Sequence, residues 1–104
     1  MAKKGYWIAH VDVSDMEAYR SYVAANAVPF KKFGARFLVR AGAAQTVEGA
    51  GRSRHVVIEF PDYAAALACY NSPEYKHAKT LREGRAQADI IVLEGYDGPQ
   101  PGDG

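Results

Sequence analysis

Four stretches of the chain are rich in β-branched and aromatic residues, a composition that favours strands. The segment Gly49-Ala-Gly51 predicts a turn into the third of these strands, because glycines readily adopt the backbone angles of tight turns. A short apolar run without alternation, Ile90–Leu93, indicates that the last strand is buried on both faces. The predicted strands cover Tyr6–Val13, Ala35–Arg40, Ser53–Phe60 and Ala88–Tyr96.

Two regions between these strands have the features of helices. Ser14 or Asp15 can cap the first helix, which should end near Pro29 or Gly34. The second helical region is predicted from Asp62 to Arg85, and Asn71–Pro73 interrupts it because Ser72 can cap a new helix that opens on Pro73. Apolar residues at helical spacing predict the stripe of the first helix that faces a sheet: Met16, Tyr19, Val23 and Ala27.

The order strand–helix–strand–strand–helix–strand predicts an α+β fold of the ferredoxin-like type, with an antiparallel sheet and the helices on one face. We expect one domain over residues 1–96 and an irregular tail over residues 97–104, which contains three glycines and two prolines. The uncovered sheet face remains apolar, since Tyr6 and Ile8 alternate with Trp7 and Ala9 in the first strand. A second copy of the sheet is the simplest cover, so we predict a homodimer.

Charge and composition narrow the classes of function. The net charge of +1, from 13 basic and 12 acidic residues, argues against nucleic acid or an anionic membrane as a partner. The single cysteine, Cys69, rules out an internal disulfide, and the histidines lack the spacing of a metal site. With no signal segment and no apolar run long enough to span a bilayer, the sequence predicts a cytoplasmic protein without metal or cofactor.

Several motifs together make the chain resemble the domain-of-unknown-function 1330 family, small proteins of the dimeric α/β-barrel type. The resemblance covers nearly all of the chain except the tail, and it implies the ferredoxin-like fold and a homodimer but no established reaction. The chain departs from the family at Cys69, where similar sequences often place a tryptophan before the tyrosine. The matching segments are Gly5–Val13, Asp15, Tyr19, Gly34–Gly42, Val56–Pro61, Ser72–Tyr75, Arg82 and Val92–Gly95.

Three ionisable residues inside strand patterns are candidate catalytic residues: His10, Arg40 and Glu59. Charged groups in strands are costly unless they are paired, so their presence needs a reason. If they converge, the histidine could exchange protons, the carboxylate could orient it and the arginine could hold a substrate carboxylate. The alternative interpretation is a structural Arg40–Glu59 pair, with His10 and His55 at the rim of a dimer.

His55, Tyr75 and Arg82 are candidate ligand-binding residues. Tyr75 and Arg82 lie seven positions apart, so both can face the same way on a continuous helix and line a pocket. The alternative is that Tyr75 packs in the core with its hydroxyl at the surface, while Arg82 caps a helix or forms an ion pair.

Two functional hypotheses follow from these residues. The first is a small homodimeric enzyme that acts on an organic acid or carbonyl compound by proton transfer. The second is a non-catalytic module that binds a small ligand or serves in a stress response, because folds of this type host both kinds of function. An enclosed pocket that holds a histidine, a carboxylate and an arginine would favour catalysis, and a shallow apolar slot would favour binding.

Overall fold

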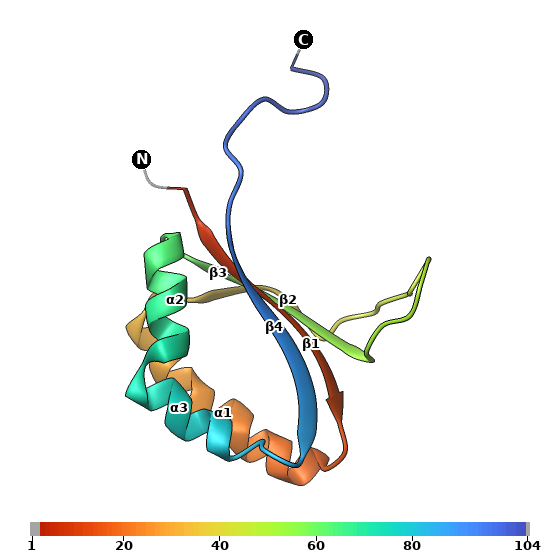
Figure 1. Cartoon of the computed structure of the whole chain (residues 1–104), viewed down its shortest axis with the longest axis vertical. Coiled ribbons are helices and arrows are strands. Elements are labelled where there is room, and N and C mark those ends of the chain that lie inside the picture. The colour runs from red at the N-terminus through yellow and green to blue at the C-terminus, as the bar shows by residue number, and fades with distance from the viewer. Residues whose placement is uncertain (1–2, 104) are drawn as a thin grey trace.

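A computed structural model describes residues 3–103 of the chain. Four antiparallel strands form one sheet in the order β2-β3-β1-β4, and the three helices cover one of its faces (Figure 1). This arrangement confirms the predicted α+β fold. The elements are β1 (Gly5–Val13), α1 (Met16–Lys32), β2 (Arg36–Arg40), β3 (Arg54–Phe60), α2 (Tyr63–Asn71), α3 (Pro73–Thr80) and β4 (Ala86–Glu94).

Side-chain caps set the beginning of each helix. The Asp15 carboxylate accepts a hydrogen bond from the backbone N–H of Ala18 at 3.1 Å, and Asp62 accepts one from Ala65 at 2.7 Å. Ser72 caps α3 in the same way, with Pro73 in the first turn. The predicted interruption of the second helical region is therefore confirmed, although α3 ends at Thr80 and the chain reaches β4 through turns.

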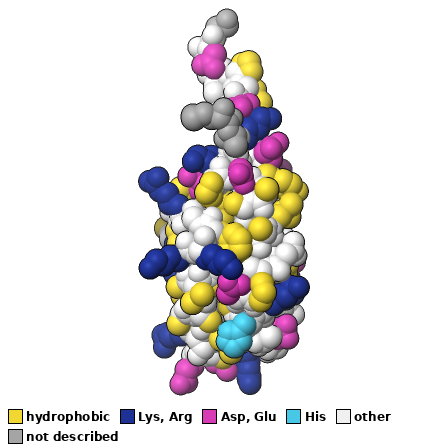
Figure 2. All heavy atoms as spheres, turned by 90° about the vertical axis from the view of Figure 1, so that its left-hand side faces the viewer, with side chains coloured by type: hydrophobic (Ala, Val, Ile, Leu, Met, Phe, Trp, Pro, Cys, Tyr) yellow, Lys and Arg dark blue, Asp and Glu magenta, His cyan; other side chains and the backbone are white. Residues whose placement is uncertain are grey.

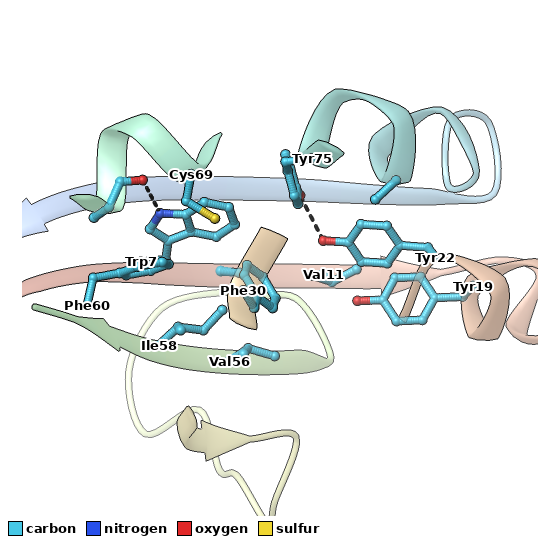
Figure 3. Packing of buried hydrophobic residues seen from close by; sticks show 13 residues of the cluster. Trp7, Val11, Tyr19, Tyr22, Phe30, Val56, Ile58, Phe60, Cys69 and Tyr75 are labelled. Atoms are coloured by element: carbon cyan, nitrogen blue, oxygen red, sulfur yellow. Dashed lines mark hydrogen bonds between the residues drawn. The ribbon is translucent and has the colours of Figure 1, made fainter. Parts of the chain in front are cut away.

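Aromatic side chains dominate the core between the sheet and the helices (Figure 3). Trp7 lies at its centre, where the indole Nε1 donates to the backbone oxygen of Ala66 in α2 at 2.8 Å. Its ring contacts those of Phe30, Phe60 and Tyr75, with centroids 5.0 to 5.4 Å apart. Trp7 is 1% exposed, so this one side chain joins β1 to all three helices.

The buried stripe of α1 differs from the predicted one. Tyr19 is buried as expected and Val23 is half-buried, but Met16 and Ala27 are exposed. The buried residues of α1 are instead Tyr19, Tyr22, Asn26, Pro29 and Phe30. The prediction followed apolar character alone and passed over Asn26, the polar member of the stripe.

The sheet face without helices, which we call the open face, retains apolar side chains. Ile91 and Leu93 of β4 are 52% and 37% exposed there, and Val39 of β2, which pairs with Val57, is 45% exposed. The last strand is thus buried on one face only in the single chain, where Ile90 and Val92 pack against the core. The expectation of burial on both faces is not met within one chain.

Two segments extend away from the sheet (Figure 1). The connection between β2 and β3, residues 41–53, forms no strand, and Arg52 at its end binds Asp12 and Asp89. Residues 97–103 form neither helix nor strand.

No helix in the described part of the chain has the length and apolarity needed to cross a membrane. On the helix-bearing side, acidic and basic side chains are interspersed (Figure 2).

Candidate functional site

A cavity of about 40 Å³ lies between the sheet and the helices, which is room for about three water molecules. Its walls are mostly apolar and include Trp7, Val11, Phe30 and Ile58. The polar groups that line it come from α1, from β2 and β3, and from the turn after α3. They are Tyr19, Tyr22, Asn26, Arg40, Arg54 and Arg82.

The three arginines of this cavity have no acidic partner within residues 3–103. Among the described residues, no salt bridge involves Arg40, Arg54 or Arg82. The Nε atoms of Arg54 and Arg82 are buried and make no hydrogen bond. Arg82 as a residue is only 8% exposed. Since guanidinium stays charged in proteins, the cavity holds positive charge that the protein itself leaves uncompensated.

Two tyrosine rings of α1 partly stabilise this charge. The guanidinium carbon of Arg54 lies 5.3 Å from the ring centroid of Tyr19, and that of Arg82 lies 5.3 Å from the centroid of Tyr22. The two rings are themselves 5.2 Å apart. Cation–π attraction of this kind does not satisfy the N–H donors, so the arginines remain available to an oxygen ligand.

Tyr75 joins Arg82 to Tyr22 by hydrogen bonds. The Tyr75 hydroxyl lies 2.7 Å from that of Tyr22 (Figure 3), and Arg82 Nη2 donates to it at 3.4 Å. Burial, with the nearby Tyr22, raises the pKa of Tyr75 far above its usual range. The structure therefore brings Tyr75 and Arg82 together as predicted, but the Tyr75 hydroxyl is buried rather than at the surface.

Arg40 reaches the cavity because of a β-bulge. Phe37 pairs with Ile58, but the register then shifts, so that Val39 pairs with Val57 and Arg40 with Val56. The shift turns Arg40 to the helix-covered face, where its guanidinium lies 4.0 Å from the ring centroid of Phe37. The side chain itself is exposed, so Arg40 lies at the mouth of the cavity.

Glu59 lies on the other face of the sheet from Arg40. It alternates with the core residues Ile58 and Phe60 of β3, and its carboxylate accepts a hydrogen bond from the Tyr6 hydroxyl at 3.4 Å. No salt bridge of the described residues joins Arg40 to Glu59. The pairing expected from the sequence is absent because Arg36 stands opposite Glu59 in the register, and because the bulge turns Arg40 to the other face of the sheet.

The two strand histidines also meet on the open face. His10 of β1 and His55 of β3 are cross-strand partners, and their Nδ1 atoms lie 2.8 Å apart. They are thus separated by the sheet from the arginines of the cavity. The structure does not assemble His10, Arg40 and Glu59 into one site, and it brings His10 together with His55 instead.

Three cavity residues escaped the sequence interpretation: Tyr22, Asn26 and Arg54. Arg54 precedes Val56, Ile58 and Phe60 on the same face of the strand, so a charge at a core-facing position was visible in the pattern. Tyr22 and Asn26 stand three and seven positions after Tyr19, the spacing of one helix face. If the predicted buried stripe of this helix had included polar residues, it would have contained both Tyr22 and Asn26.

Other reactive side chains lie away from this cavity. Cys69 is buried, and burial raises the pKa of its thiol to about 12, as expected for an inert core cysteine. His77 is exposed on α3. In the part of the chain that the structure describes, no three His, Cys, Asp or Glu side chains gather closely enough to hold a metal ion.

Comparison with known proteins identifies the family. The family model described as a domain of unknown function, DUF1330, matches residues 4–96. This match confirms the resemblance found in the sequence motifs. The chain matches no curated protein sequence.

Solved structures share the fold at low sequence identity. A protein of unknown function from Rhodopseudomonas palustris is 17% identical, with a TM-score of 0.73 over 94% of this chain and 86% of that one. SnoaB, a cofactor-independent oxygenase from Streptomyces nogalater, is 12% identical, with a TM-score of 0.62 over 93% and 97%. A dimeric ferredoxin-like protein of unknown function from Thermobifida fusca is 12% identical, with a TM-score of 0.60 over 90% and 92%. These likenesses establish the ferredoxin-like fold.

Proposed function

We propose that this chain, which belongs to the DUF1330 family, binds a small organic acid in the cavity between its sheet and helices. The observation that carries the proposal is the set of three guanidinium groups, Arg40, Arg54 and Arg82, that face one cavity without an acidic partner. A carboxylate accepts two parallel hydrogen bonds from a guanidinium group.

The unpartnered Nε atoms of Arg54 and Arg82 support this assignment. A buried N–H donor without a partner costs free energy, and that cost is removed when an anion supplies the missing acceptor. The surrounding apolar walls favour a ligand that has a hydrocarbon part as well as a charge. The volume of about 40 Å³ favours an acid of only a few non-hydrogen atoms.

Binding is better supported than histidine-based catalysis. A general base must lie within hydrogen-bond reach of the proton that it removes, but His10 and His55 lie on the opposite face of the sheet from the cavity. The cavity residues offer a charge clamp and tyrosine hydroxyls. We therefore favour a ligand-binding module over an enzyme that uses these histidines for proton transfer.

We further propose that the protein is a homodimer formed by the open faces of two sheets. Exposed Ile91, Leu93 and Val39 support this arrangement, since contiguous apolar surface of this kind marks an association site. A solved neighbour with the same fold is described as dimeric. In such a dimer, both cavities would remain on the outer, helix-covered sides.

A thermal-shift titration tests the proposed ligand. Acetate, propionate and pyruvate should raise the melting temperature in a concentration-dependent way, while acetamide and propionamide should not, because the amides lack the charge. Phosphate and chloride at equal ionic strength distinguish an organic acid from any small anion. Equal shifts with the acids and with chloride would contradict the proposal.

Two matched variants localise the effect. Arg54→Met should abolish the shift caused by the acids, since Arg54 lines the cavity without a partner. Arg52→Met should keep it, because Arg52 lies on the open face and binds Asp12 and Asp89. A shift that survives Arg54→Met but not Arg52→Met would place the binding site elsewhere.

A further inference from the structure

The hydroxyl proton of Tyr75 has only one acceptor among the hydrogen bonds of the described residues. Tyr75 is fully buried, and its hydroxyl contacts Tyr22 and Arg82. Arginine has five donors and no acceptor, so Arg82 can only donate to the Tyr75 oxygen. The Tyr75 proton must then go to the Tyr22 oxygen, because a buried hydroxyl without an acceptor is costly.

This requirement gives the chain of hydrogen bonds a direction. Arg82 donates to Tyr75, and Tyr75 donates to Tyr22 at 2.7 Å. The Tyr22 hydroxyl hydrogen is therefore not used within the chain of bonds. Tyr22 lines the cavity, whereas Tyr75 does not, so the free hydrogen is available to a ligand there.

We propose that Tyr22 is a specificity-determining hydrogen-bond donor for a second oxygen atom of the bound acid. The positive charge of Arg82 at the start of the chain polarises the two hydroxyls and strengthens the donor at its end. An acceptor oxygen without a hydrogen of its own, such as a ketone or enolate oxygen, fits this donor. This inference rests on the proposed binding of a small organic acid.

The ligand class that follows is a short 2-oxo acid. Its carboxylate would occupy the arginines and its oxo group would accept from Tyr22, while the remaining hydrocarbon would contact the apolar wall. A three-carbon 2-oxo acid has six non-hydrogen atoms, so part of it would lie in the mouth of this cavity, where Arg40 is exposed. A methylene at the same position offers no acceptor, and a hydroxyl, which can accept from Tyr22, would bring a hydrogen of its own that needs a second acceptor.

Isothermal titration calorimetry with pyruvate and propionate tests this inference, because the two acids differ at the oxo position. In the wild-type protein, we expect pyruvate to bind roughly fivefold to tenfold more tightly, the value of one good hydrogen bond. In Tyr22→Phe, both acids should still bind and the ratio should fall to about one.

Two further variants test whether Tyr75 orients the Tyr22 hydroxyl or whether any change near Tyr75 disturbs binding. Tyr75→Phe removes the hydroxyl that orients Tyr22, so the preference for pyruvate should shrink while propionate affinity stays nearly constant. Tyr70→Phe should leave the ratio unchanged, since the Tyr70 ring packs on Tyr75 but lies outside the cavity. Circular dichroism checks that each variant is folded.

The outcomes distinguish this inference from the proposed function. If both acids bind the wild-type protein equally, or if the preference survives Tyr22→Phe, the role of Tyr22 is refuted while acid binding stands. If neither acid binds the wild-type protein, both proposals are refuted.

Discussion

The two faces of this sheet come from the same strands but carry side chains of different chemical character. The helix-covered face carries the aromatic core around Trp7 and a cavity with unpaired positive charge. The open face carries exposed Ile91 and Leu93 beside the His10–His55 pair. Because neighbouring residues of a strand point to opposite faces, each strand contributes to an interior site and to an outer surface at once.

Arg52 and Arg54 show the difference most clearly. Arg52 binds the carboxylates of Asp12 and Asp89 at 3.0 and 2.7 Å, so its positive charge is compensated within the protein. Arg54, two positions later, faces the cavity and has a buried Nε without a partner. An arginine with internal partners holds structure together, whereas one without them is available to a ligand.

The largest expected effect comes from the core side of β1. Trp7→Ala should lower the free energy of unfolding by about 3–5 kcal/mol, because it leaves a large cavity and removes the hydrogen bond to Ala66. Ile8→Ala, one position later on the open face, should cost less. Urea unfolding of both variants at one protein concentration measures the difference. Equal losses would show that the two faces do not differ in packing.

The open face is tested by a charge placed among its apolar side chains. Ile91→Glu should convert the proposed dimer to a folded monomer, because a carboxylate in the interface would be desolvated without a partner. Light scattering should then report the 11.3 kDa chain mass in place of about twice that value. Val47→Glu, on the loop where Val47 is 87% exposed, is the control that should stay dimeric.

At Arg54, we expect a single substitution to raise the stability of the protein while it abolishes binding of the acid. Arg54→Met should raise the free energy of unfolding by about 1 kcal/mol, because it removes an unsatisfied buried donor while keeping apolar contacts. For a domain of this size, the melting temperature would rise by about 4–8 °C. Differential scanning calorimetry without ligand measures the change. A loss of stability would indicate that Arg54 is structural, like Arg52.

A smaller effect is expected at Cys69 of α2, on the helix-covered face, where we predict slow reaction of the thiol. Since burial raises the pKa of its thiol to about 12, almost no thiolate exists in the folded protein at pH 8. Ellman's reagent should therefore react only as fast as the protein opens, and reaction should become fast in urea. Immediate reaction of the native protein would show that α2 does not stay packed on the sheet.

The smallest effect is expected for the segment that belongs to neither face. A chain that ends at Tyr96 should keep the mass of the proposed dimer and melt within a few degrees of the full chain. The hydrogen bonds and ion pairs that join the described tail to the rest of the chain are a hydrogen bond from Tyr96 to the backbone of Pro99 and an exposed ion pair between Lys3 and Asp97. Loss of the dimer would mean that the tail contributes to the interface.

Sequence patterns were sufficient for the fold, because strand composition, the Asp15 and Ser72 caps and the Pro73 start are local signals. They also placed Tyr75 and Arg82 near each other, although α3 ends at Thr80 and Arg82 reaches Tyr75 from the turn after it and not from a continuous helix. They failed for Arg40, whose direction depends on a bulge that the sequence does not show. They failed for Tyr22 and Arg54 because the core-facing positions were assigned without counting polar groups, although the lack of a partner for Arg54 becomes visible only in the folded chain.

The bulge in β2 also has an evolutionary consequence. Leu38 is the extra residue of the bulge, so its loss would leave Val39 opposite Val57 and Arg40 opposite Val56, and Arg40 would still face the cavity. A family built on this strand could thus vary in length at this point and keep the charge at the entrance of its pocket. A difference of one residue in the length of β2 between relatives would then not by itself change the residue at this position of the pocket.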